Sequence, residues 1–180
     1  SQINFDENGY IEINSSNIHL PEARYELVKT MRASVLVMGP LIAKYGKAKI
    51  SQPGGCDIGS RPIDFHLSGL EQMGAEIKSD SKYIYLNAKN LKPIDFEFPK
   101  ISVTGTENLM MAAVLTEGKT ILRNCAKEPE VVELANFLNK SGASINGAGE
   151  SKIEINGVKN LDNVKWNVLF DRIEAGTYLV

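Results

Sequence analysis

The sequence predicts a mixed α/β (α+β) fold, because helical and strand-like patterns alternate along its 180 residues and one unit recurs. Three segments alternate as half-buried strands do: Ile11–Asn14, Ile84–Asn87 and Ile153–Asn156. Two segments, LEQMGAEI at 70–77 and LNKSGASI at 138–145, are typical of a helix end, a glycine cap and a new strand. The unit is helix, Gly-Ala, strand, turn, strand, about every 70 residues.

Helices and strands are also expected between these copies. Apolar residues at helical spacing predict a helix over Arg24–Tyr45, which Gly39-Pro40 should kink and Gly46 should cap. Pro62 should open a helix that ends before Gly74. The remaining predicted elements are strands Ala48–Ser51 and Thr120–Arg123, a helix over Thr106–Thr116 and a helix opened by Pro129.

The first copy of the unit is incomplete. Ile3 stands where Ile77 and Ile145 stand in the later copies, just after the Gly-Ala position. We therefore expect the native chain to extend upstream by at least one helix and a strand. The alternative is an N-terminal hairpin unrelated to the repeat.

Composition narrows the class of protein. The chain is 43% hydrophobic and 23% charged, which is typical of a soluble globular protein. A formal net charge of −2 argues against nonspecific nucleic-acid binding, so an anionic ligand would need a few placed cations. We expect no signal peptide and no membrane span. Two cysteines, Cys56 and Cys125, suggest reduced thiols in a cytosol.

The loop Pro53–Pro62 is the most informative segment. Its glycines allow the backbone to approach a ligand closely, and it ends at a helix start. There the free N–H groups of Asp64 and Phe65 and the helix dipole favour an anion, and Arg61 adds a fork suited to phosphate. An ordinary surface turn is the alternative.

The two cysteines receive different interpretations. Cys56 lies in this loop near Arg61, where a thiol can have a lowered pKa or donate a proton. A small buried filler is the alternative for Cys56. Cys125 follows a strand without neighbouring glycines, and we assign it to structure.

Lys100–Thr106 is a second strand-to-helix junction. Its hydroxyl side chains can cap the helix or bind oxygen ligands, and simple capping is the alternative to a ligand site. Arg32 lies on a mostly apolar helix, for which a snorkelling side chain is the simple account. The lone histidines, His19 and His66, lack ligand-like spacing, and we predict no metal site.

Several motifs resemble the UDP-N-acetylglucosamine enolpyruvyl transferase family, in that family's order and spacing over nearly the whole chain. They are Leu27–Ser34, Pro53–Cys56, Gly59–Asp64, Thr104–Asn108, Met110–Ala113, Glu128–Val132 and Asp171–Gly176. The resemblance implies an inverse α/β barrel of two similar domains, each built from three βαβαββ-type repeats. The chain then divides into the tail of a truncated first repeat (1–14), a second repeat with the catalytic loop 53–61 (15–87), a third repeat (88–168) and the start of a second domain (169–180).

The resemblance also implies an activity. Enolpyruvate moves from phosphoenolpyruvate to the 3′-hydroxyl of UDP-N-acetylglucosamine by addition and then phosphate elimination. This is the first committed step of peptidoglycan precursor synthesis, in the cytoplasm. The resemblance implies no metal and no organic cofactor, and the composition predicts no nucleic-acid or membrane partner.

Site residues follow from the resemblance by position. Cys56 matches the family's proton donor to the enolpyruvyl methylene carbon, which fosfomycin alkylates. Arg61 matches the arginine that meets both substrates' phosphates, and Arg32 a further substrate-side arginine. The segments that match nucleotide contacts are Pro62, Ile63, Asp64 and Phe65, and then Lys100, Ile101, Ser102 and Val103.

Other family elements would lie before Ser1 or beyond Val180: a Lys-Asn pair, the aspartate that takes the sugar hydroxyl's proton, and another phosphate-binding arginine. We therefore expect no turnover by these residues alone, and self-association through apolar surface that the absent helix would cover. The alternatives are an enolpyruvyl transferase with another acceptor and a repeat-built phosphate-binding module.

Overall fold

Three β-hairpins share one register. In the computed structural model, which describes residues 2–16, 18, 20–28, 31–52 and 63–180, Ile3 pairs with Ile13, Ile77 with Leu86 and Ile145 with Ile155. These are the positions that the repeat aligns, so the predicted repeat is confirmed. The hairpin strands are β1 (Gln2–Phe5) with β2 (Ile11–Asn14), β5 (Glu76–Ser79) with β6 (Tyr83–Asn87), and β9 (Ser144–Asn146) with β10 (Lys152–Asn156).

The second and third hairpins each belong to a four-stranded sheet. One sheet has the order β3-β4-β6-β5 and the other β7-β8-β10-β9. In each, the first two strands are parallel and the other pairs antiparallel. The added strands are β3 (Glu22–Ala23), β4 (Lys47–Ser51), β7 (Asp95–Glu97) and β8 (Lys119–Arg123).

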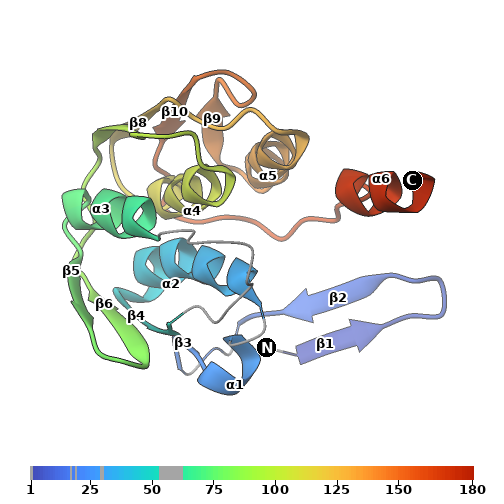
Figure 1. Ribbon diagram of the computed structural model, residues 1–180, viewed down its shortest axis with the longest axis horizontal. Coiled ribbons are helices and arrows are strands. Elements are labelled where there is room, and N and C mark those ends of the chain that lie inside the picture. The colour runs from blue at the N-terminus through green and yellow to red at the C-terminus, as the bar shows by residue number, and fades with distance from the viewer. Residues whose placement is uncertain (1, 17, 19, 29–30, 53–62) are drawn as a thin grey trace.

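The first hairpin stands apart. Strands β1 and β2 form a two-stranded sheet that extends away from the rest of the molecule (Figure 1). Ile13 is 65% exposed, whereas its counterparts Leu86 and Ile155 are 2% and 0% exposed. The repeat therefore places apolar side chains on this hairpin that nothing covers in the part of the chain described.

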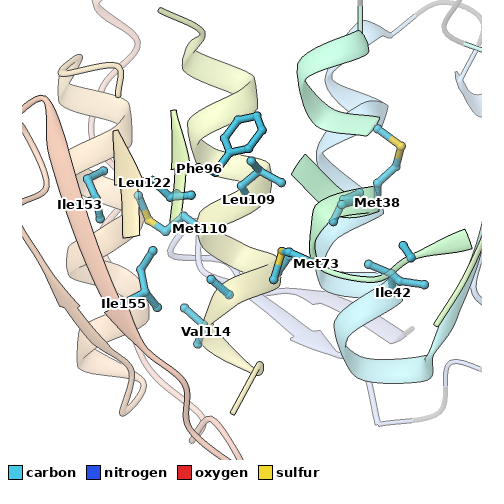
Figure 2. Packing of buried hydrophobic residues seen from close by; sticks show 14 of the residues in the cluster. Met38, Ile42, Met73, Phe96, Leu109, Met110, Val114, Leu122, Ile153 and Ile155 are labelled. Atoms are coloured by element: carbon cyan, nitrogen blue, oxygen red, sulfur yellow. The ribbon is translucent and has the colours of Figure 1, made fainter. Parts of the chain in front are cut away.

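The core lies between the two larger sheets. Helix α2 (Met38–Tyr45) packs on β4 and on α4 (Val103–Val114), and α4 also packs on β8 and β10. Figure 2 shows Met38 on one side of α4 and Ile153 on the other, with Leu109 and Met110 of α4 between them. The other helices are α1 (Tyr25–Val28), the 3₁₀ helix η1 (Arg32–Val37), α3 (Asp64–Gln72), α5 (Pro129–Lys140) and α6 (Arg172–Leu179). No helix in the described residues has the length and apolar character to cross a bilayer.

The continuous helix predicted over Arg24–Tyr45 is wrong. The segment divides into α1, η1 and α2, and residues 29–30 lie outside the described residues. Pro40 lies in the first turn of α2, where a missing N–H breaks no helical hydrogen bond. The Gly39-Pro40 pair therefore stands at a helix start instead of producing a kink inside one.

Other predicted boundaries agree more closely. Gly46 caps α2 with φ +68°, Pro129 opens α5, and α3 ends before Gly74. Helix α4 starts at Val103, three residues earlier than expected, because Ser102 caps it: the Ser102 hydroxyl accepts a hydrogen bond from the Gly105 N–H at 3.1 Å.

Helices α2, α3 and α4 run in the same direction. Gly39 of α2 lies against Asn108, and Gly69 of α3 lies against Leu109. A Cβ on Gly39 would overlap the backbone and side-chain oxygens of Asn108, so only glycine permits this approach. Since His66, one turn before Gly69, contacts Thr104, the first turns of α3 and α4 lie together at one end of the core.

Candidate substrate-binding site

The start of α3 has two backbone donors that lack a partner inside the helix. Ile63 is the N-cap residue and provides no side-chain cap, while its carbonyl accepts from the His66 N–H at 3.0 Å. The N–H groups of Asp64 and Phe65 precede the first helical hydrogen bond, so they have no partner within the helix. Ile63 and Phe65 pack partly against the core, whereas Asp64 is exposed. Partial packing against the core thus places two backbone donors at a positive helix end.

The start of α4 is partly satisfied by its own side chains. Ser102 caps the Gly105 N–H, and the Thr106 hydroxyl donates to the Ser102 carbonyl at 2.8 Å. Ser102 therefore acts as a helix cap, which is the alternative that the sequence left open for this junction. The N–H groups of Val103 and Thr104 remain without a helical partner.

One histidine joins these two helix starts. The Nε2 atom of His66 lies 3.3 Å from the hydroxyl of Thr104, and its Nδ1 lies 3.0 Å from Nδ2 of Asn108. His66 is only 3% exposed, and burial lowers its pKa to about 4, so the ring is neutral at pH 7. The structure therefore brings the two predicted nucleotide-contacting segments together through a neutral imidazole.

Several predicted residues lie outside this description. Cys56, Arg61 and Pro62 fall in the segment 53–62, outside the described residues. The backbone of Arg32 begins η1, but its side chain is likewise not described. Lys100 and Ile101 are exposed just before α4, and Ile101 is 60% exposed. The described residues hold no group of three or more His, Cys, Asp or Glu placed to bind a metal ion.

Cys125 has the structural place predicted for it. Its thiol is free and fully buried, and burial raises its pKa to about 11. At neutral pH this thiol is protonated and shielded, which makes it a poor nucleophile.

Sequence reasoning missed a buried carboxyl on α4. Glu107 is 8% exposed, and burial, together with the charges of Glu130 and Glu128, raises its pKa to about 7. Glu130 in turn forms a bidentate ion pair with Arg172 of α6, with contacts of 2.9 and 3.2 Å. No local pattern marks Glu107, because its environment comes from the packing of α5 onto α4.

Two open hollows lie at the other end of the helices. One, of about 730 Å³, lies beside the C-terminal ends of α2 and α4 and includes Tyr45, Leu115 and Lys159. The other, of about 530 Å³, shares these three residues and includes Pro40. Neither is lined by the described residues at the starts of α3 and α4, so we place the candidate site at the helix starts on the chemistry of their donors.

Solved structures share this architecture. An enolpyruvyl transferase, NikO from Streptomyces tendae, superimposes with a TM-score of 0.80 at 20% identity, over 98% of this chain and 42% of that one. An EPSP synthase from Acinetobacter baumannii superimposes with a TM-score of 0.64 at 18% identity, over 89% of this chain and 37% of that one. The fold is therefore the inverse α/β fold of the enolpyruvyl transferases.

Sequence comparison identifies the family as well as the fold. The family model described as EPSP synthase (3-phosphoshikimate 1-carboxyvinyltransferase) matches residues 1–180, and this chain belongs to that family. Among curated relatives, UDP-N-acetylglucosamine 1-carboxyvinyltransferase of Hydrogenovibrio crunogenus is 57% identical over 99% of this chain and 43% of its own length. The enzyme of the same name from Myxococcus xanthus is 60% identical over 89% of this chain and 38% of its own length. The chain thus spans about two fifths of these relatives.

Proposed function

We propose that this chain forms part of a UDP-N-acetylglucosamine 1-carboxyvinyltransferase and carries its nucleotide-binding helix starts and its proton-donating cysteine. The observation that carries the proposal is the contact of His66 with Thr104, which places the starts of α3 and α4 side by side. Two positive helix ends whose first N–H groups have no partner inside the helix suit a diphosphate better than one. The names of the relatives supply the acceptor, UDP-N-acetylglucosamine.

The proposed chemistry uses the loop before α3. Cys56 gives its thiol proton to the methylene carbon of phosphoenolpyruvate, while the sugar 3′-hydroxyl gives its proton to a carboxylate base and its oxygen bonds to the adjacent carbon. A base then takes a proton from the methyl group so formed, the C–H electrons form the new C=C bond, and phosphate leaves with the electrons of its C–O bond, which gives an enolpyruvyl ether. Arg61 and Arg32 neutralise phosphate charge in this scheme, and Ile63–Phe65 with Lys100–Val103 hold the nucleotide.

Fosfomycin labelling tests this proposal. In the full-length protein its epoxide should alkylate Cys56, and UDP-N-acetylglucosamine should speed the labelling, as followed by mass spectrometry of the tryptic peptides. Cys125 is the internal control and should stay unlabelled, because its side chain is fully buried. Nucleotide-independent labelling, or equal labelling of both cysteines, would contradict the proposal.

A second set of measurements distinguishes UDP-N-acetylglucosamine from other acceptors and from phosphate alone. The 180-residue chain should bind UDP-N-acetylglucosamine more tightly than inorganic phosphate, and Arg61→Ala should weaken binding by about 2–5 kcal/mol if the ion pair is buried. Binding that ignores the uridine and sugar parts would favour a general phosphate-binding module. Preference for an acceptor without uridine diphosphate would favour another enolpyruvyl transferase.

Two smaller proposals accompany this function. We place the reaction in the cytoplasm, supported by the free thiol of Cys125. We also propose that the 180-residue chain alone self-associates through its first hairpin and does not turn over. The exposed Ile13 supports the proposed self-association. The proposed lack of turnover is supported by the chain's share of 43% of a relative's length. The division into repeats at 1–14, 15–87 and 88–168, followed by 169–180, stays a proposal.

A further inference from the structure

A chain of three hydrogen bonds crosses the core near the helix starts. The Gly39 N–H of α2 donates to Oδ1 of Asn108 at 2.7 Å. Nδ2 of Asn108 lies 3.0 Å from Nδ1 of His66 on α3, and Nε2 of His66 lies 3.3 Å from Oγ1 of Thr104. Asn108 is fully buried, so each of its polar atoms must find a partner inside the protein.

The direction of these bonds fixes the state of the histidine. Because Oδ1 of Asn108 already accepts from Gly39, the atom that faces His66 is the amide nitrogen, which can only donate. Nδ1 of His66 must therefore be an unprotonated acceptor. The ring proton then lies on Nε2 and is donated to Thr104.

The position of the ring connects this network to the proposed nucleotide-binding helix starts. His66 is the third residue of α3 and Thr104 the second residue of α4, so the imidazole connects the first turns of both helices. We infer that His66, held as the Nε2–H tautomer by Asn108, is a positioning residue that sets the spacing of the two helix starts for a nucleoside diphosphate. The inference rests on the proposed function of those helix starts.

Protonation of His66 would break this arrangement. A proton on Nδ1 would face the N–H of Asn108, and turning the amide to accept it would leave the Gly39 N–H facing a donor. Burial opposes protonation by lowering the pKa of the ring to about 4. The other ionisable side chains on the three joined helices are Lys44 and Tyr45 on α2, Asp64 and Glu71 on α3, and Glu107 on α4.

The substitution Asn108→Asp tests the tautomer of His66 separately from the packing of the side chain at position 108. One carboxylate oxygen can still accept from Gly39, while the other accepts from Nδ1 and therefore favours a proton there. Nitrogen NMR of the imidazole in the 180-residue chain should show the Nε2–H tautomer in the wild type. In Asn108→Asp the His66 pKa should rise by at least about one unit. Asn90→Asp, at an exposed position, is the matched control and should leave His66 unchanged.

Nucleotide binding completes the experiment. Affinity for UDP-N-acetylglucosamine should fall about tenfold in Asn108→Asp at a pH where His66 is charged, and recover as the ring loses its proton. A wild-type Nδ1–H tautomer overturns the inference. So does a raised His66 pKa with unchanged nucleotide affinity at every pH.

A further readout separates this inference from the proposed function. If the wild-type chain binds no nucleotide, the proposed function fails for this chain. The inference is then decided by the amide resonances of Phe65 and Gly105, which lie in the first turns of α3 and α4. Resonances that follow the titration of His66 support positioning, and resonances that stay fixed overturn it.

Discussion

The Gly39 N–H donates a 2.7 Å hydrogen bond to the side-chain oxygen of Asn108, and this close approach presses α2 onto α4. Because a Cβ at Gly39 would overlap the backbone oxygen of Asn108 as well as its side chain, the clash cannot be relieved by a rotamer change alone. The packing of two core helices thus depends on the absence of one methyl group.

Gly39→Ala should therefore lower the free energy of unfolding by about 2–3 kcal/mol, measured by urea denaturation. Gly176→Ala is the control, because no atom lies within 4 Å of a Cβ at this position in α6. That control should be neutral or slightly stabilising, since alanine favours a helix more than glycine does. Equal stability of Gly39→Ala and the wild type would show that α2 can move away from α4 without cost.

The exposed first hairpin should make the chain associate with itself. Ile3 and Ile13 form a cross-strand pair that is 53% and 65% exposed, and β2 has an unpaired edge in the described structure. Sedimentation should show an average mass that rises with protein concentration. Ile13→Lys should reduce this rise, because it places a charge on the apolar hairpin.

Val168→Lys is the matched control for that experiment. Val168 is 85% exposed but lies in the extended segment before α6, away from any strand edge. If both substitutions reduce association equally, the added charge alone is responsible and the hairpin is not the contact. A monomer at every concentration would rule out this self-association.

Cys125 should react with thiol reagents only after unfolding. Its side chain is fully buried, and burial raises its pKa to about 11, so at pH 8 the native thiolate population is small. Iodoacetamide followed by mass spectrometry should modify Cys125 in urea but not in buffer. Rapid modification in buffer would mean that the β7-β8-β10-β9 sheet and α4 open locally far more often than their packing suggests.

Local patterns predicted the hairpin strands, β4 and β8 well, but they missed the short strands β3 and β7 and predicted the helix packing poorly. The three hairpins could be predicted because Ile3, Ile77 and Ile145 occupy equivalent places in a repeat, and the structural role of Cys125 because it follows a strand without neighbouring glycines. The break before α2 could not be, because the apolar spacing over Arg24–Tyr45 is the same whether or not the segment is one helix.

The same limit applies to the candidate site. The helix starts at Ile63 and Ser102 follow from glycine, proline and capping residues near them in sequence. The link between them does not, because His66 and Thr104 are 38 residues apart and only folding brings them together. In the sequence His66 is therefore an isolated histidine, and only the packing of the helices gives it Thr104 and Asn108 as partners.

The buried carboxyl of Glu107 should make the chain less stable as pH rises. Burial, with the charges of Glu130 and Glu128, raises its pKa from 4.5 to about 7 in the folded state. The folded chain therefore binds this proton more tightly than the unfolded chain does, so its stabilising contribution is complete below about pH 4.5 and is lost as pH rises through 7.

Glu107→Gln should remove this dependence and be more stable than the wild type at pH 8 by about 1–2 kcal/mol, since solvent at the site screens part of the effect. Urea denaturation at pH 5 and pH 8 measures the difference, with Glu150→Gln at an exposed position as the control. A Glu107→Gln variant that loses as much stability as the wild type between these two pH values would mean that another group is responsible.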